Sequence, residues 1–80
     1  MADRADETVG QRVGRLRDRL LLTQSGLSLA SEVPLPTIKD IERGRTQTPH
    51  VATLRRLAEA LRVEPEYLRF GDTPAGQRPQ

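Results

Sequence analysis

The chain has 80 residues, of which 35% are hydrophobic and 30% are charged, a length that suits one domain with a single core. It has no cysteine and one histidine, His50, which excludes a disulfide framework, a thiolate metal site and a multi-histidine zinc site. The net charge is +2, the longest apolar run is Leu20–Leu22, and the acidic N-terminus lacks the pattern of a signal peptide. We therefore expect a small, soluble, intracellular domain.

The first predicted helix begins after a short polar segment. Residues 1–7 are small and charged, which predicts a disordered lead-in. Thr8 and Gln11 have the spacing of a capping box, in which each side chain bonds the other's backbone N–H. An apolar stripe at helical spacing follows, made of Val9, Val13, Leu16 and Leu20. Three basic residues fall off this stripe, namely Arg12, Arg15 and Arg19.

Two short helices are predicted between Thr23 and Gly44. Thr23 can cap the first of them. The chain leaves helical geometry at residues 33–36, because two prolines push the residues before them toward extended conformations. The second proline is tolerated in the first turn of the next helix, where its missing N–H needs no partner. Ile38 and Ile41 give that helix its buried side, and Gly44 ends it.

The remainder of the chain predicts two more helices. Residues 45–49 form a polar loop. A fourth amphipathic helix follows, with Val51, Leu54, Leu57, Ala58 and Leu61 on its apolar face. Glu64 and Pro65 open a short fifth helix that Gly71 ends, and residues 72–80 are expected to be a disordered tail. Because no segment shows the two-residue alternation of a strand, the prediction is an all-α domain of five helices over residues 8–71.

Positive charge is concentrated on the part that is predicted to fold. Residues 9–71 carry ten Arg, one Lys and seven acidic residues, a net charge of +4, whereas residues 1–8 carry −2. Guanidinium groups suit phosphates and base edges better than ammonium groups do. This charge therefore fits nucleic-acid binding, although it also fits ordinary solvated helix faces.

The motifs of the two central helices carry a family resemblance. The segments Thr23–Leu27 (TQSGL) and Thr37–Gly44 (TIKDIERG) resemble the lambda-repressor-like, XRE-type (Cro-type) helix-turn-helix DNA-binding domains. Pro49 and the segment Leu57–Leu61 (LAEAL) continue the pattern, and the resemblance runs from Val9 to Phe70 without gaps. It implies a compact five-helix fold in which the second and third helices form the helix-turn-helix.

The resemblance also implies a recognition helix at about residues 35–43 that enters the major groove. The positions that it assigns to DNA contact are Gln24, Leu35, Pro36, Thr37, Lys39, Asp40, Arg43, Arg45 and Gln47. Lys39 can donate to guanine, and Asp40 can accept from cytosine N4 or remain a solvated charge. Leu35 and Pro36 offer no side-chain hydrogen bonds, so we expect direct base readout to be thin.

Other positions match phosphate contacts in this family. Gln24 lies at a helix N-terminus, where backbone N–H groups favour an anion, although it can also be a plain first-turn residue. Arg43, Arg45 and Gln47 match a loop that follows the DNA backbone without reading sequence, or they form a solvated turn. Arg12 and Arg15 are weaker candidates for such contacts.

Two further positions concern architecture. Arg17 and Glu42 match a largely buried ion pair between the first and third helices, and an unpaired carboxylate beside Ile41 would be costly. Glu32 stands where the pattern usually has glycine, so it is expected to adopt a left-handed conformation or to change the turn.

These observations predict a double-stranded-DNA-binding transcriptional regulator, a repressor that works as a homodimer in the cytoplasm on the nucleoid. Val63, Tyr67 and Phe70 form the candidate dimer surface, or they complete the core. The alternative is an antitoxin-like or adaptor protein that uses the fold to hold a protein partner. An enzyme fits worst, because the chain has no thiol, no evident carboxylate pair and no glycine-rich phosphate loop, and no cofactor, metal or membrane partner is expected.

Overall fold

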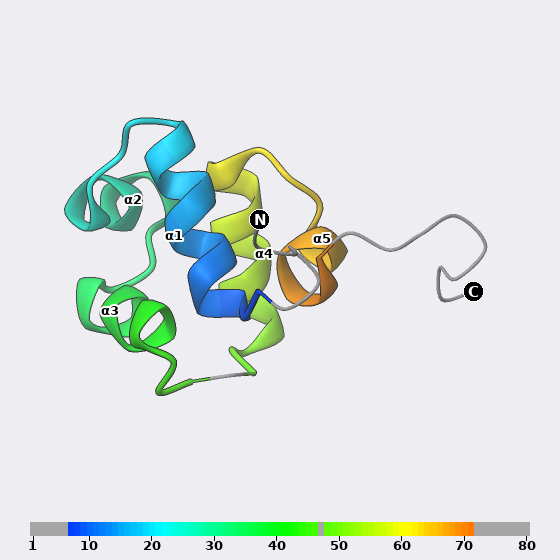
Figure 1. Ribbon diagram of the computed structural model, residues 1–80. Helices are drawn as coiled ribbons and strands as arrows, with labels where there is room; N and C mark the ends of the chain where they lie inside the picture. Colours follow the sequence, from blue (N-terminus) through cyan, green and yellow to red (C-terminus); the bar gives the residue numbers. More distant parts are fainter. Residues whose placement is uncertain (1–6, 47, 72–80) are drawn as a thin grey trace.

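The computed structural model describes residues 7–46 and 48–71, and within them it contains five helices and no strand (Figure 1). The helices are α1 (Val9–Arg19), α2 (Gln24–Ser31), α3 (Leu35–Arg43), α4 (Val51–Leu61) and α5 (Pro65–Phe70). The predicted all-α class is therefore confirmed. The expected disorder of the lead-in and of the tail concerns residues that lie outside the described part, except for Glu7. In the described part no helix has both the length and the apolar character needed to cross a membrane.

The central helix of the arrangement is α1. It packs against α3, α4 and α5, while α2 packs against α3 and α4. In Figure 1, α2 and α3 lie on one side of α1 and α5 lies on the other. The helix-turn-helix formed by α2 and α3 is thus supported from behind by the rest of the domain.

The core confirms the apolar pattern of the sequence except at Val51, which was expected on the apolar face of the fourth helix and is 53% exposed in its first turn. Its buried hydrophobic residues are Val13, Leu16, Leu27, Val33, Ile38, Ile41, Leu54, Leu57, Ala58, Leu61 and Leu68. The proposed dimer surface is divided, because Val63 and Tyr67 pack against this core whereas Phe70 is 58% exposed. Each fully buried leucine or isoleucine contributes about 1.5–3 kcal/mol by leaving water.

Local hydrogen bonds fix the helix ends where the sequence predicts them. The Thr8 hydroxyl accepts from the Gln11 backbone N–H at 3.1 Å, and the Gln11 side chain accepts from the Thr8 N–H at 3.0 Å, which completes the capping box. The Thr23 hydroxyl accepts from the Gly26 N–H at 2.9 Å. Gly44 ends α3 with φ of 83°, a left-handed conformation that glycine adopts at little cost.

Serine side chains hold the turn between α2 and α3. Glu32 ends α2 with φ of 62°, a left-handed conformation, which is the first of the two outcomes that the family resemblance implied for this non-glycine residue. The Ser31 hydroxyl donates to the Leu27 carbonyl at 2.7 Å and accepts from the Val33 N–H at 3.2 Å. The Ser28 hydroxyl donates to the Val33 carbonyl at 2.6 Å. These bonds satisfy buried backbone groups of the turn and offset the strain at Glu32.

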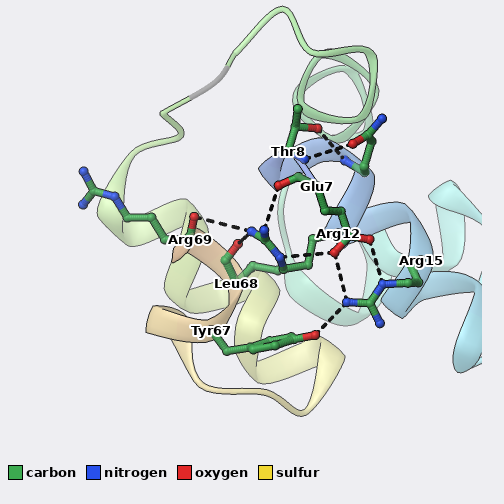
Figure 2. A network of polar contacts seen from close by, with 8 residues as sticks. Glu7, Thr8, Arg12, Arg15, Tyr67, Leu68 and Arg69 are labelled. Carbon is green, nitrogen blue, oxygen red and sulfur yellow. Dashed lines mark hydrogen bonds and ion pairs between the residues drawn. The ribbon is translucent and has the colours of Figure 1, made fainter. Parts of the chain in front are cut away.

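A polar network attaches α5 to α1 (Figure 2). The Arg12 side chain is only 3% exposed and donates to the Leu68 carbonyl at 2.8 Å and to the Arg69 carbonyl at 3.4 Å. It also donates to the Glu7 carbonyl at 2.8 Å. A cation near the last carbonyls of a helix is stabilising, so one guanidinium joins the start of α1 to the end of α5.

Arg15 extends the network toward Tyr67. Its Nε and Nη2 donate to the Glu7 carboxylate at 2.7 and 3.1 Å, and Nη2 also donates to the Tyr67 hydroxyl at 2.6 Å. The hydrogen bonds to Glu7 raise the pKa of the Arg15 guanidinium above its ordinary value. The structure gives both guanidinium groups partners within the domain, which argues against the weaker expectation that Arg12 and Arg15 contact phosphate. Glu7 belongs to this folded region rather than to a loose lead-in.

Replacing Arg12 tests the network. We expect Arg12→Ala to lower the free energy of unfolding by about 2–4 kcal/mol, because buried carbonyl groups lose their donors and a carboxylate loses one cation. Urea denaturation followed by circular dichroism measures this change. Arg19→Ala, on the exposed side of the same helix, is the control and should cost about 0.5 kcal/mol or less. Equal losses in the two variants would contradict the assigned role of Arg12.

The left-handed conformation of Glu32 leads to a second prediction. We expect Glu32→Gly to raise the free energy of unfolding by about 0.5–1 kcal/mol, because glycine adopts positive φ without the steric cost. Thermal unfolding should show a midpoint higher by a few degrees. Glu59→Gly, at an exposed interior position of α4, is the matched control and should lose about 1 kcal/mol. Destabilisation by both glycines would argue against strain at Glu32.

Candidate nucleic-acid interface

The candidate interface consists of the N-terminus of α2, the outer side of α3 and the loop after α3. The prolines at the start of α3 set its first turn, and the Pro34 carbonyl accepts from the Thr37 N–H at 3.0 Å. Ile38 and Ile41 face the core and are fully buried, as predicted. This burial orients α3 and leaves its remaining positions on the outside.

The structure leaves all the described candidates outside the core. Three are exposed, namely Pro36, Arg43 and Arg45. Five are half-buried, namely Gln24, Leu35, Thr37, Lys39 and Asp40. The ninth candidate, Gln47, lies outside the described residues.

Glu42 brings the first three helices together. Its Oε2 accepts from Arg17 Nε at 2.8 Å, and its Oε1 accepts from Arg17 Nη2 at 3.1 Å. The same Oε1 accepts from Gln24 Nε2 at 3.1 Å. The ion pair is well shielded, with side chains 16% and 13% exposed. The bonds join α1 to α3 and fix the direction of the Gln24 side chain at the start of α2.

Arg17 has two further partners. Its Nη1 donates to the Leu22 carbonyl at 2.7 Å and to Asp18 at 3.3 Å. The hydrogen bonds to Glu42 raise the pKa of the guanidinium further above its ordinary value, at which it is already charged. The bond to Leu22, which sequence analysis missed, also ties the loop before α2 to α1. Because the acceptor is a backbone carbonyl, the spacing of residue types in the sequence does not reveal this bond.

The chain reverses direction directly after α3. The Gly44 N–H donates to the Ile41 carbonyl at 3.1 Å, and the Arg45 N–H donates to the Asp40 carbonyl at 2.9 Å. Arg43 and Arg45 stand on either side of this reversal, and both are exposed. The glycine thus places two guanidinium groups at the C-terminal end of α3.

The cations of this surface differ from those of α1. Arg12, Arg15 and Arg17 each form an ion pair with a carboxylate. Among the described residues, by contrast, no acidic side chain forms an ion pair with the three cations of the interface, which are Lys39, Arg43 and Arg45. The cations that have no ion-pair partner within the described part therefore include this group on α3 and in the loop after it. Their charge can attract an anion.

The first turn of α3 has a different character. Leu35 and Pro36 present apolar side chains beside the half-buried Thr37. Such side chains can contact a methyl group or match a groove by shape, but they neither donate nor accept hydrogen bonds. The first polar side chain of α3 is thus that of Thr37, and the charged side chains of the helix follow it toward the C-terminal end.

Two curated relatives from Bacillus subtilis (strain 168) are similar to this chain. The HTH-type transcriptional repressor RghR is 36% identical over 64 residues, which are 80% of this chain and 47% of that protein. The uncharacterized HTH-type transcriptional regulator RghRB is 39% identical over 59 residues, which are 74% of this chain and 42% of that protein. The chain thus spans less than half the length of these relatives.

A solved structure and a family model agree with these relatives. The P22 c2 repressor, crystallised with synthetic operator 9T in the presence of Tl⁺, superposes with a TM-score of 0.76 at 32% identity. The match covers 82% of this chain and 98% of the repressor chain. A helix-turn-helix family model matches residues 13–68, which include α2, α3 and α4 in full. The chain therefore belongs to the helix-turn-helix family, in its lambda-repressor-like, XRE-type form.

Proposed function

We propose that this protein binds duplex DNA in a sequence-dependent manner and acts as a small transcriptional regulator, specifically a repressor. The observation that carries the proposal is a group of cations on and after α3, Lys39, Arg43 and Arg45, that form no ion pair with any described residue. The relatives support it, because RghR is named a transcriptional repressor and the P22 c2 repressor is seen with an operator. None of these names describes an enzyme.

In the proposed complex, α3 lies in the major groove. Lys39 donates to guanine O6 or N7, while Thr37 bonds a phosphate or a base and Asp40 accepts from cytosine N4. Leu35 and Pro36 contact thymine methyl groups or read groove shape. With few hydrogen-bonding side chains on the first turn, sequence preference depends strongly on Lys39.

Phosphate contacts provide most of the proposed affinity. Arg43 and Arg45 bind the backbone from the loop after α3, and Gln47 is proposed to join them. At the start of α2, Gln24 donates one amide proton to Glu42 and directs the other to a phosphate. The backbone N–H groups at the start of α2 support this contact, apart from that of Gly26, which donates to the Thr23 hydroxyl.

We further propose that the protein acts as a homodimer. One helix-turn-helix makes few contacts, and two-fold dimers read half-sites about 34 Å apart. Phe70, which is 58% exposed at the end of α5, is the proposed centre of the dimer contact. The role places the protein with the chromosome, in the cytoplasm on the nucleoid.

A second candidate function is an antitoxin-like or adaptor role. Leu29 on α2 is 84% exposed, and such an apolar side chain on the helix-turn-helix itself can contact a protein partner. The absence of ion pairs between Lys39, Arg43 or Arg45 and the residues that the structure describes favours DNA. The binding experiment below separates the two roles.

Selection of bound sites from a random duplex library at near-physiological salt tests the proposed function. We expect enrichment of a two-fold symmetric motif whose half-site spacing locates the two α3 helices. Lys39→Ala should relax preference at one base position and reduce discrimination there by about 1–3 kcal/mol. An unchanged site preference removes Lys39 as a reader. Failure of the wild-type protein to enrich any motif shifts the assignment to the adaptor role.

The salt dependence of binding tests the phosphate contacts. Arg43→Ala and Arg45→Ala should each weaken binding to all sequences and reduce the slope of log K against log salt by about one. Titrations at several salt concentrations measure the slope. Arg62→Ala is the control, because this exposed arginine lies at the other end of α4 from the loop and should retain the full slope. Unchanged slopes in both loop variants would contradict the assigned contacts.

A further inference from the structure

Gly10 marks the closest approach between α1 and α3. A side-chain carbon at this position would overlap the carbonyl oxygen of Ile41. It would also lie 3.0 Å from the Ile41 carbonyl carbon and 3.1 Å from the Cα of Glu42. All three atoms belong to the backbone of α3, so no side-chain rotation can make room. Any residue larger than glycine must displace the last turn of α3.

The displaced turn carries much of the candidate interface. Glu42, which is bonded to Arg17 and Gln24, lies in it. Arg43 follows directly, and the reversal at Gly44 is fixed by the Ile41 carbonyl that Gly10 touches. A shift of this turn therefore alters the place of α3 relative to the start of α2.

We propose that Gly10 is a positioning residue for DNA binding: the missing side chain sets how closely α3 lies on α1, and thereby the geometry of the whole interface. The proposal rests on the proposed function. Gly10 itself lies under α3 and touches no DNA. It acts through the carbonyl group of Ile41 and the backbone of Glu42.

A positioning role differs from a purely structural one in its effect on stability. Alanine favours a helix over glycine by about 1 kcal/mol, which offsets part of the cost of moving α3. We therefore expect Gly10→Ala to fold while its interface is displaced. Gly14→Ala is the matched control on the same helix, because a methyl group there would lie 3.4 Å from a Glu42 side-chain oxygen, an ordinary contact.

The first experiment measures affinity for the duplex selected above, or for a mixed-sequence duplex if none is enriched. We expect Gly10→Ala to bind about tenfold more weakly or worse, because binding groups must be held to within about 0.5 Å. Gly14→Ala should bind like the wild type. Wild-type affinity in Gly10→Ala overturns the proposal.

The second experiment measures the helix displacement without DNA. Because the chain has no cysteine, spin labels can be attached at Arg19→Cys on α1 and Arg43→Cys on α3, both exposed positions. The distance between the labels should change with Gly10→Ala and stay constant with Gly14→Ala. An unchanged distance overturns the proposal, and this test stands even if the wild-type protein binds no duplex.

A Gly10→Ala variant that does not fold also tests the proposal. If Gly10→Ala unfolds, the substitution is repeated in the Gly14→Ala background, whose added helix propensity contributes about 1 kcal/mol. A folded double variant then enters both experiments with the expectations given above. Unfolding in both backgrounds assigns Gly10 a purely structural role and overturns the proposal.

Discussion

The Glu42 carboxylate holds the helix-turn-helix together, because it accepts hydrogen bonds from Arg17 on α1 and Gln24 on α2. A carboxylate beside the buried Ile41 would be costly without partners, and three donors satisfy it. The bonds act at the start of α2 and at the end of α3. The orientation of α3 thus depends on a polar contact in addition to its two buried isoleucines.

The distribution of charge follows from this arrangement. Within the described residues, the arginines of α1 that face the domain are neutralised by Glu7 and Glu42. The cations on and after α3 have no such partner there. Three of the other eight cations of residues 9–71 are paired inside the fold, whereas Lys39, Arg43 and Arg45 lie within seven residues of one another on and after a single helix. A modest overall charge therefore still leaves a local group of cations on this surface. Composition alone shows the amount of charge, whereas the pairing shows where it is available.

Local chemistry made most of the fold predictable. The capping box of Thr8 and the positive φ of Gly44 depend on neighbouring residues, so their patterns are visible in sequence, whereas the left-handed Glu32 was expected from the family resemblance. The contacts of Arg12 and Arg15 were missed, because they join residues more than fifty positions apart through backbone carbonyls and a tyrosine hydroxyl. The DNA contacts were assigned by resemblance, and they stay predictions. What the structure adds is their exposure and the absence of ion pairs to Lys39, Arg43 and Arg45 within the described part.

The Arg12 guanidinium has a topological consequence. It bonds the carbonyl of Glu7 and the carbonyl of Leu68 at the same time, so one guanidinium links residues near the two ends of the described body. They meet beside α5, on the far side of α1 from α3 (Figure 1). A second module joined directly to residue 7 or residue 71 would consequently begin beside α5 and not beside α3. The same proximity makes the domain suitable for circular permutation, because a short linker could close the chain while new termini open elsewhere.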